Sequence, residues 1–295
     1  MEAMTVWYNT VGRTAVRRTH ALAAKHPAVG AAAGGKTMKV VILAGGFGTR
    51  ISEESVLKPK PMVEIGGKPI LWHIMKGYAH YGYTDFIICA GYKQDVIKQY
   101  FFDYYLHNAD VSFDLATNTM QVLNSHAEPW KVTVVDTGLN TMTGGRIKRV
   151  QPYIGDETFM LTYGDGVSNI DLNALEAFHR AHGRTVTMSS YNVGQQFGVL
   201  DVGADGVVTG FREKQELDGS MINIGFMVCE PGLFDVIDGD DTVLEKAPLE
   251  TLARQGRLQS CCHTGFWKCM DNVRDKKQLE TLWASGNAPW KVWQE

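Results

Sequence analysis

Residues whose types and spacing suit phosphate binding lie early in this chain. The apolar run Val40–Leu43 is followed by a segment with three glycines, a threonine and an arginine, Gly45–Arg50, and then by a lysine between two prolines, Lys60. Glycines at the end of a strand let backbone N–H groups approach a ligand, and hydroxyl, guanidinium and ammonium groups donate to phosphate oxygens. The spacing therefore predicts a site for a polyphosphate.

Two common glycine-rich phosphate motifs are disfavoured for this segment. A dinucleotide loop has the pattern Gly-x-Gly-x-x-Gly, but Ile51 stands where its third glycine belongs. The Gly-Lys-Ser/Thr of a P-loop is absent as well. On this segment alone, an ordinary glycine-rich turn with surface charges stays open as an alternative.

Two acidic residues farther along the chain are candidates for holding a divalent cation. Asp165 lies between two glycines after the apolar run 159–163, and Asp271 follows the aromatic segment 265–270. Mg²⁺ takes one or two protein carboxylates together with phosphate oxygens and water. Each acid also has a simpler interpretation, a Gly-Asp-Gly turn for Asp165 and an N-cap of the next helix for Asp271.

Further charged residues follow expected strands. We interpret Thr143–Arg146 as a second glycine-rich loop whose arginine binds an anion. Lys60 is interpreted as a cation whose backbone is held rigid by the prolines on either side. Glu213 and Lys214 follow the expected strand 207–211, where a carboxylate accepts sugar hydroxyl donors and a lysine neutralises a sugar phosphate. Solvated surface charges are the alternative for all of them.

The composition is that of a globular protein. The chain has 295 residues, of which 44% are apolar and 21% charged, with a net charge of −3. The charge argues against a nucleic-acid-binding surface, and no apolar run is long enough for a membrane span. An odd number of cysteines, five, favours free thiols in the cytoplasm. A zinc site at Cys261, Cys262, His263 and Cys269 is disfavoured because adjacent cysteines are poor tetrahedral ligands.

Two regions are expected. Residues 1–37 carry five basic residues and one acidic residue, and we expect a poorly ordered N-terminal extension, with a transit-type presequence as the alternative. Residues 38–295 are expected to form one domain. The expected strands are 39–43, 86–90, 131–136, 159–163, 185–190 and 222–229, the expected hairpin is 198–202 with 207–211, and the expected helices are 69–81, 95–106, 171–182, 248–255 and 273–285.

The alternation of these elements predicts the fold and places the site. Repeated strand–helix units indicate an α/β fold with a mostly parallel, doubly wound sheet and β-hairpin insertions. Ligands bind such sheets beyond the carboxyl ends of the strands. Both Gly45–Arg50 and Gly164–Gly166 follow strands directly, so we expect them at one edge of the sheet.

Longer motifs give the chain a specific resemblance from Met38 onward. It resembles the sugar-1-phosphate nucleotidyltransferases, and within them the glucose-1-phosphate cytidylyltransferases, which make CDP-glucose. The segments that carry the resemblance are Leu43–Arg50, Lys58–Met75, Asp85–Tyr92, Val135–Gly138, Met142–Arg146, Thr162–Gly166, Phe197–Asp201, Gly265–Trp267 and Ala288–Lys291. The resemblance implies a Rossmann-like fold, CTP and α-D-glucose 1-phosphate as substrates, Mg²⁺ as cofactor, and a homo-oligomer such as a hexamer with active sites near subunit contacts.

The resemblance also implies roles for individual residues. Arg50, Lys60, Asp165 and Asp271 would be catalytic, and the last two would hold Mg²⁺. Three residues, Gln215, Ile224 and Cys269, depart from the family pattern, and the first two bear on the identity of the sugar. The nucleotide would be bound by Leu43, Ala44, Gly45, Gly46, Phe47, Gly48, Thr49, Arg50, Lys60, Thr141, Arg146, Gly164 and Asp165, and the sugar phosphate by Glu213, Lys214, Asn223 and Gly225.

The implied reaction is an in-line displacement. A phosphate oxygen of glucose 1-phosphate attacks the α-phosphorus of CTP, and pyrophosphate leaves. The nucleophile is already anionic, so charge neutralisation and alignment are needed and a general base is not. Arg50 and Arg146 are expected to offset triphosphate charge. A uridylyl- or thymidylyltransferase, a non-catalytic nucleotide-sugar-binding module and a dinucleotide-dependent oxidoreductase stay open as alternatives.

Overall fold

The computed structural model describes residues 36–51, 57–193, 199–202, 204, 206–212 and 220–294. Of the extension predicted to be poorly ordered, residues 1–35 lie outside this description. Lys36, near the end of that extension, is part of the folded domain. It forms an isolated β-bridge with Tyr83, and its ammonium lies 2.7 Å from the carboxylate of Glu176. Among the described residues, no helix is long and apolar enough to cross a membrane.

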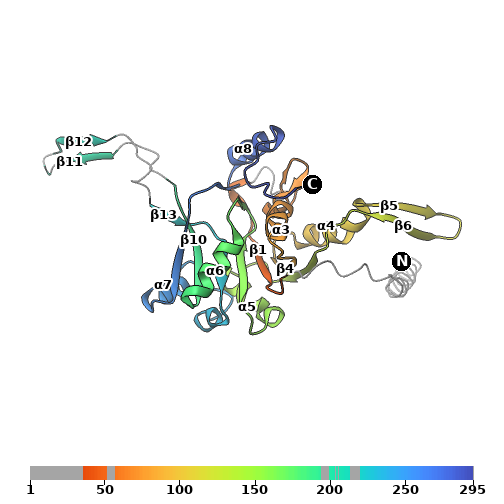
Figure 1. Ribbon diagram of the computed structural model, residues 1–295, viewed down its shortest axis with the longest axis horizontal. Helices are drawn as coiled ribbons and strands as arrows, with labels where there is room; N and C mark the ends of the chain where they lie inside the picture. The colour runs from red at the N-terminus through yellow and green to blue at the C-terminus, as the bar shows by residue number, and fades with distance from the viewer. Residues whose placement is uncertain are drawn as a thin grey trace, which may run out of the picture. The chain divides into compact units, whose positions relative to one another are not determined.

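Four parallel strands form one side of the main sheet, part of which can be followed in Figure 1. β1 (Val40–Ala44) lies between β4 (Asp85–Ala90) and β8 (Phe159–Tyr163), and β7 (Lys131–Asp136) pairs with the far side of β4. All five residues of β1 are buried, as the continuous apolar sequence of a strand covered on both faces predicts. The chain builds outward from β1 to β7 and then returns to the other side of β1, so the strand order changes direction there.

Beyond β8 the sheet continues through antiparallel pairs. β14 (Met227–Cys229) runs antiparallel to β8, and β10 (Val186–Asn192) runs antiparallel to β14. β10 also pairs with β13 (Met221–Asn223) and, in parallel, with β15 (Leu258–His263). The prediction of an α/β fold with a mostly parallel sheet is confirmed for the four parallel strands, while this half of the sheet is mixed.

Alternate residues of β1 contribute to two separate apolar cores. Ile42 belongs to one core with the buried residues of α3 (Ile70–His80), and Val41 belongs to the other with those of α5 (Thr143–Ile154). Because neighbouring side chains of a strand point to opposite faces, helices cover both faces of the sheet. The doubly wound arrangement is therefore confirmed.

The five predicted helices are all present, each within one residue of its expected ends. Besides α3 they are α4 (Gln94–His107), α6 (Leu172–His182), α7 (Ala247–Arg254) and α8 (Val273–Ala284). Asp171 caps α6, because its carboxylate accepts from the backbone N–H groups of Asn173 and Ala174.

α5 corrects the interpretation of residues 143–146 as a loop, since they form its first turn. A Cβ on Gly144 would lie 2.7 Å from the carbonyl oxygen of Thr242, and one on Gly145 would lie 2.6 Å from Cα of Asp240. The N–H groups of both glycines donate to that same Thr242 oxygen. The glycines therefore let the helix pack directly on backbone, and these two N–H groups are already paired.

The remaining strands form hairpins and short ladders. The predicted hairpin is present as β11 (Val199–Val202) with β12 (Val208–Arg212), whereas β5 (Ala109–Asp114) with β6 (Thr119–Ser125) was not predicted. The expected strand 222–229 is interrupted between β13 and β14. The other described elements are β2 (Glu64–Ile65), β3 (Lys68–Pro69), β9 (Gly166–Ser168), β16 (Trp267–Cys269), and the 3₁₀ turns η1 (Thr49–Ile51), η2 (Lys60–Met62) and η4 (Pro231–Val236).

Candidate active site

An open cleft of about 390 Å³ lies at the carboxyl ends of β1 and β8. The backbone joins the two walls there, because the N–H of Gly164 donates to the carbonyl oxygen of Leu43 at 2.9 Å. This is the point at which the strand order changes direction, the usual ligand site of such sheets. The lining residues are 43–49, Lys60, Pro61, 139–143, Arg146 and 163–165.

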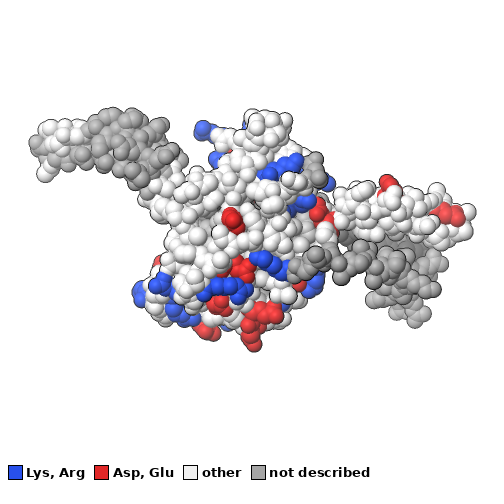
Figure 2. Space-filling view, viewed as in Figure 1, with Lys and Arg blue, Asp and Glu red and all other residues white. Residues whose placement is uncertain are grey.

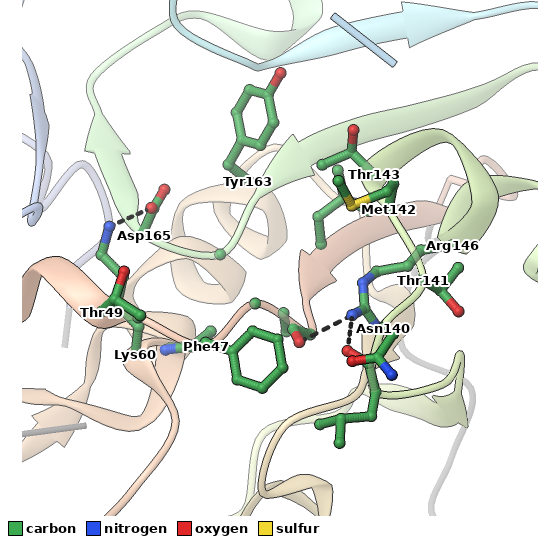
Figure 3. Close-up of a pocket in the computed structure, with 18 residues that line it drawn as sticks. Phe47, Thr49, Lys60, Asn140, Thr141, Met142, Thr143, Arg146, Tyr163 and Asp165 are labelled. Atoms are coloured by element: carbon green, nitrogen blue, oxygen red, sulfur yellow. Dashed lines mark hydrogen bonds and ion pairs between the residues drawn. The ribbon is translucent and has the colours of Figure 1, made fainter. Parts of the chain in front are cut away.

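Lys60 lies between the two predicted metal ligands. Its ammonium is 2.6 Å from Oδ2 of Asp165 and 2.6 Å from Oδ1 of Asp271. Figure 3 shows Lys60 and Asp165 on one side of the cleft. The three residues come from η2, the turn after β8 and the segment after β16, so the fold brings together groups that the sequence separates widely.

The environment of Lys60 keeps it charged. The side chain is 11% exposed, and this burial by itself lowers its pKa. The Coulombic attraction of Asp165 and the hydrogen bonds to Asp165 and Asp271 outweigh burial, so that the pKa is raised above the ordinary lysine value. The ammonium therefore remains protonated at neutral pH, and it holds the two carboxylates at a common point.

Asp271 is not the cap of the following helix. The N-cap of α8 is Asn272, whose side chain accepts from the N–H of Asp275. The carboxylate of Asp271 instead contacts Lys60 and accepts a hydrogen bond from the Cys269 thiol at 3.5 Å. Burial, reinforced by the nearby carboxylates, raises the pKa of Cys269 to about 11, so the group beside Asp271 is a neutral thiol.

Arg146 forms a buried connection between the two loops that line the other side of the cleft. Its Nη1 donates to Thr137 Oγ1 at 2.8 Å and to the carbonyl oxygens of Gly138 at 2.7 Å and Ala90 at 3.3 Å. Its Nη2 donates to the carbonyl oxygens of Gly45 at 3.0 Å and Leu139 at 3.2 Å. Arg146 lines the cleft, but the residue is only 5% exposed and its guanidinium is surrounded by protein oxygens (Figure 3), so its contact with the triphosphate stays a prediction.

Two glycines make room for the Arg146 guanidinium. A Cβ on Gly45 would overlap Nη1 and Cζ and lie 2.8 Å from Nε. A Cβ on Gly91 would overlap Nη1 and lie 2.8 Å from the carbonyl oxygens of Gly138 and Gly45. Gly45 thus has a packing role in addition to the ligand-binding role that the sequence predicts.

The rest of the glycine-rich segment keeps an open face. Nothing lies within 4 Å of the position that a Cβ on Gly46 would occupy, and Gly48 has a φ of +65°, which favours glycine. Phe47 is 46% exposed, and its ring lies 5.4 Å from that of Tyr92. The backbone of Arg50 is in η1, and its side chain lies outside the described part of the chain.

The predicted sugar-phosphate residues are described only in part. Asn223 ends β13, and its side-chain oxygen accepts from the N–H of Gly225 at 2.9 Å. Gly225 has a φ of +77°, and a Cβ there would lie 2.9 Å from the ring of Tyr163. Glu213 and Lys214 lie outside the described residues.

Several lining residues were missed by sequence reasoning. Leu139, Asn140, Met142 and Thr143 follow the end of β7, and Tyr163 is the last residue of β8. Their position just after parallel strands was the available signal, because that position places them at the ligand-binding edge. These neutral side chains were missed because the prediction relied on glycines and charged residues.

Comparison with known proteins agrees with this geometry. The family model described as "Nucleotidyl transferase" matches residues 39–268. A glucose-1-phosphate cytidylyltransferase of Salmonella typhimurium is 56% identical over 258 residues, covering 87% of this chain and all of the relative. A probable glucose-1-phosphate cytidylyltransferase of Bacillus subtilis is 45% identical, again covering 87% of this chain and all of the relative.

A solved structure supports the fold independently. The structure of a UDP-glucose pyrophosphorylase complexed with UDP-glucose aligns with a TM-score of 0.62 at 16% identity, covering 85% of this chain and all of that one. At this identity the likeness concerns the fold alone. With a family model over most of the chain and relatives of high identity over their full length, the chain belongs to the nucleotidyl transferase family and is a nucleotidyltransferase of the glucose-1-phosphate cytidylyltransferase type.

Proposed function

We propose that this enzyme transfers the cytidylyl group of CTP to α-D-glucose 1-phosphate, giving CDP-glucose and pyrophosphate. The observation that carries the proposal is the convergence of Lys60, Asp165 and Asp271 beside the glycine-rich segment at the strand switch point. The substrates are those named for the relatives that are 56% and 45% identical. The open backbone of Gly46–Thr49 provides a surface on which phosphates can be bound.

The two carboxylates fit a magnesium ion. Both approach one ammonium within 2.6 Å, so their oxygens already point to a common place for a cation, and oxygen is the ligand that Mg²⁺ prefers. Among the described residues no group of three or more His, Cys, Asp or Glu could hold a metal. We therefore infer that Asp165 and Asp271 hold Mg²⁺ together with substrate phosphate oxygens, where the ion neutralises phosphate charge.

The residues of the cleft align the two reacting groups. A phosphate oxygen of the sugar phosphate forms a bond to the α-phosphorus, and the bond to the leaving pyrophosphate breaks. We infer that Lys60, as a protonated cation beside both carboxylates, contributes positive charge at the reacting phosphates. The loop that carries Gly45 and the loop that carries Leu139 receive the nucleotide, and Arg146 fixes their spacing. Arg50, Glu213 and Lys214 keep their expected roles as proposals.

We also propose that the enzyme is a homo-oligomer, for which the hexamer implied by the resemblance is the working model. In α4, Ile97 is buried, while Phe102 is 75% exposed. The hairpin β5–β6 exposes Phe113 and Leu123, and Figure 2 shows a largely uncharged surface there. Apolar surface of this kind marks protein contacts, and a lone two-stranded hairpin is marginally stable. Phe113→Asp should lower the mass measured by light scattering, and an unchanged mass would oppose this assignment.

A cytoplasmic location is part of the proposal. All five cysteines are free thiols, and Cys89 and Cys229 are buried. Reducing compartments maintain free thiols. The proposed substrates, a nucleoside triphosphate and a sugar phosphate, require no membrane partner.

One experiment tests the reaction and its alternatives together. Pyrophosphate release is measured with CTP, UTP, dTTP and GTP against glucose 1-phosphate and several other sugar 1-phosphates, with and without Mg²⁺. We expect release with CTP and glucose 1-phosphate that depends on Mg²⁺. Preference for UTP or dTTP would refute the choice of base, and the absence of release with every pair would favour a binding module.

A further inference from the structure

A directed hydrogen-bond network lies on the β8 side of the cleft and ends at Glu245. The hydroxyl of Tyr163 donates to Oε1 of Glu245 at 2.7 Å, and the hydroxyl of Thr143 donates to Oε2 at 2.7 Å. Tyr163 and Thr143 both line the cleft and are labelled in Figure 3. One carboxylate therefore holds hydroxyls from the end of β8 and the start of α5.

The direction of every bond in the network is determined. The Thr143 oxygen accepts from the N–H of Leu244 at 2.9 Å, and the Tyr163 oxygen accepts from Nδ2 of Asn223 at 3.1 Å. The side-chain oxygen of Asn223 in turn accepts from the N–H of Gly225 at 2.9 Å, which fixes the orientation of the amide. Since each hydroxyl has one proton, both protons point to Glu245, one to each carboxylate oxygen.

The network joins the predicted sugar-phosphate residue Asn223 to the cleft wall. Its described members belong to β8, α5, β13 and the segment 244–245, and none belongs to the glycine-rich segment 43–51. Burial and the nearby Glu245 carboxylate raise the pKa of Tyr163, so the phenol remains a neutral donor. Gly225 allows the β13–β14 turn to pack on the Tyr163 ring, because a Cβ at this position would lie 2.9 Å from the ring.

We propose that Glu245 is a positioning residue for the hexose 1-phosphate, which acts by holding Tyr163 and Asn223 in the orientation that receives the sugar side of the substrate. This inference rests on the proposed function, in which Asn223 and Gly225 meet the sugar phosphate. Glu245 contacts no substrate in this assignment. Its role is to fix a wall of the cleft that the sequence pattern did not reveal.

Conservative substitutions test the network. Glu245→Gln keeps the size of the side chain but leaves one acceptor oxygen for two hydroxyls, and Tyr163→Phe removes one of the donors. Each should raise the KM for glucose 1-phosphate about tenfold, the effect of losing one hydrogen bond to a charged group, and leave the KM for CTP within about twofold. Because both variants disrupt the same network at Glu245, the effects of the two substitutions should be less than additive in the double variant.

A matched variant separates positioning from general damage. Glu250→Gln changes another exposed carboxylate, on α7, which lies 4.0 Å from Arg254, and it should leave both KM values unchanged. The proposal is overturned if the two KM values rise together, if neither changes, or if the effects of the two network variants add.

A binding measurement distinguishes failure of this inference from failure of the proposed reaction. Calorimetry with CTP and with CDP-glucose needs no turnover. Glu245→Gln should weaken CDP-glucose binding about tenfold and leave CTP binding unchanged, even if the wild type released no pyrophosphate. Equal affinity of the variant and the wild type for CDP-glucose, or no CDP-glucose binding by the wild type, would overturn the inference.

Discussion

Replacing Gly45 by alanine should destabilise the protein through a collision with one side chain. The added Cβ would overlap the guanidinium of Arg146, lying 2.8 Å from Nε and closer still to Nη1 and Cζ. Carbon and nitrogen atoms in contact are normally about 3.5 Å apart, so the guanidinium must move by roughly 1 Å. A movement of this size disrupts several of its five hydrogen bonds, whose lengths are 2.7 to 3.3 Å.

The expected magnitude follows from the number of bonds lost. A hydrogen bond to a charged group contributes about 1.5–3 kcal/mol, so losing two of them in a buried site costs about 3 kcal/mol or more. Gly46→Ala is the matched control, because that position has open space and no left-handed backbone. It should change the free energy of unfolding by less than about 0.5 kcal/mol. Urea denaturation of the two variants compares these values directly.

A double-mutant cycle identifies the collision as the cause. Arg146→Ala removes the atoms that the added Cβ would overlap, so Gly45→Ala should cost far less in that background, with a coupling of about 2 kcal/mol. Gly45→Ala should also raise the KM for CTP, because Arg146 holds the carbonyl oxygens of Gly45 and Leu139. If Gly45→Ala lowered the free energy of unfolding as little as Gly46→Ala, or by the same amount with and without Arg146, Arg146 would not connect the two loops as described.

Two further predictions follow from the charged and titratable groups. Lys60→Ala and Asp271→Asn should each lower kcat by orders of magnitude, while the circular dichroism spectrum stays that of the folded protein. The control is Lys58→Ala, whose ion pair with Glu64 is more exposed, and it should change kcat less than about twofold. Near-normal turnover of the Lys60 or the Asp271 variant would contradict the proposed site. Burial lowers the pKa of His73 to about 4, so this side chain stays neutral in the fold while it protonates in the unfolded chain below about pH 6.5. The contribution of His73 to the free energy of unfolding is therefore fully present above pH 6.5 and should fall by about 3 kcal/mol between pH 6.5 and 4. His73→Gln should make the midpoint of urea denaturation depend less on pH in this range. An equally steep dependence in the variant would assign the effect to other groups.

The sequence predicted β1, β4 and β8 because burial on both faces requires a nearly continuous apolar run. β7 and β8 have the predicted ends, and β1 is displaced by one residue. α5 was not predicted because Gly144 and Gly145 are poor helix formers. The two glycines are needed because the backbone of residues 240–242, which are distant in sequence, packs against this turn of α5. The strand expected at 222–229 is interrupted where Gly225 and Phe226 have positive φ angles, a turn that packs on β8.

The candidate site was likewise predicted only in part from the sequence. Position after a parallel strand was sufficient to place Asp165 at the ligand-binding edge. The grouping of Lys60 and Asp271 with it came from the resemblance to the family, because η2 and β16 do not belong to the parallel sheet. Residue type did not reveal the orientation of Arg146, because a guanidinium binds carbonyl oxygens as readily as phosphates. Glu245 was missed because its partners, Tyr163 and Thr143, become neighbours only after the sheet and α5 have packed.

The positive charge of Lys60 is paired with two carboxylates before substrate binds, and this pairing affects how a triphosphate can be neutralised. Lys60 lies between two carboxylates, so its ammonium supplies no surplus positive charge to phosphate in this state. Arg146 keeps its positive charge, but its N–H groups donate to neutral carbonyl and hydroxyl oxygens. In-line transfer places additional charge on the leaving oxygens. We infer that a divalent cation must balance Asp165 and Asp271, because only then does the Lys60 ammonium have charge available for phosphate. The dependence of activity on Mg²⁺ should therefore be a property of the ion pairs within the cleft as much as of the nucleotide itself.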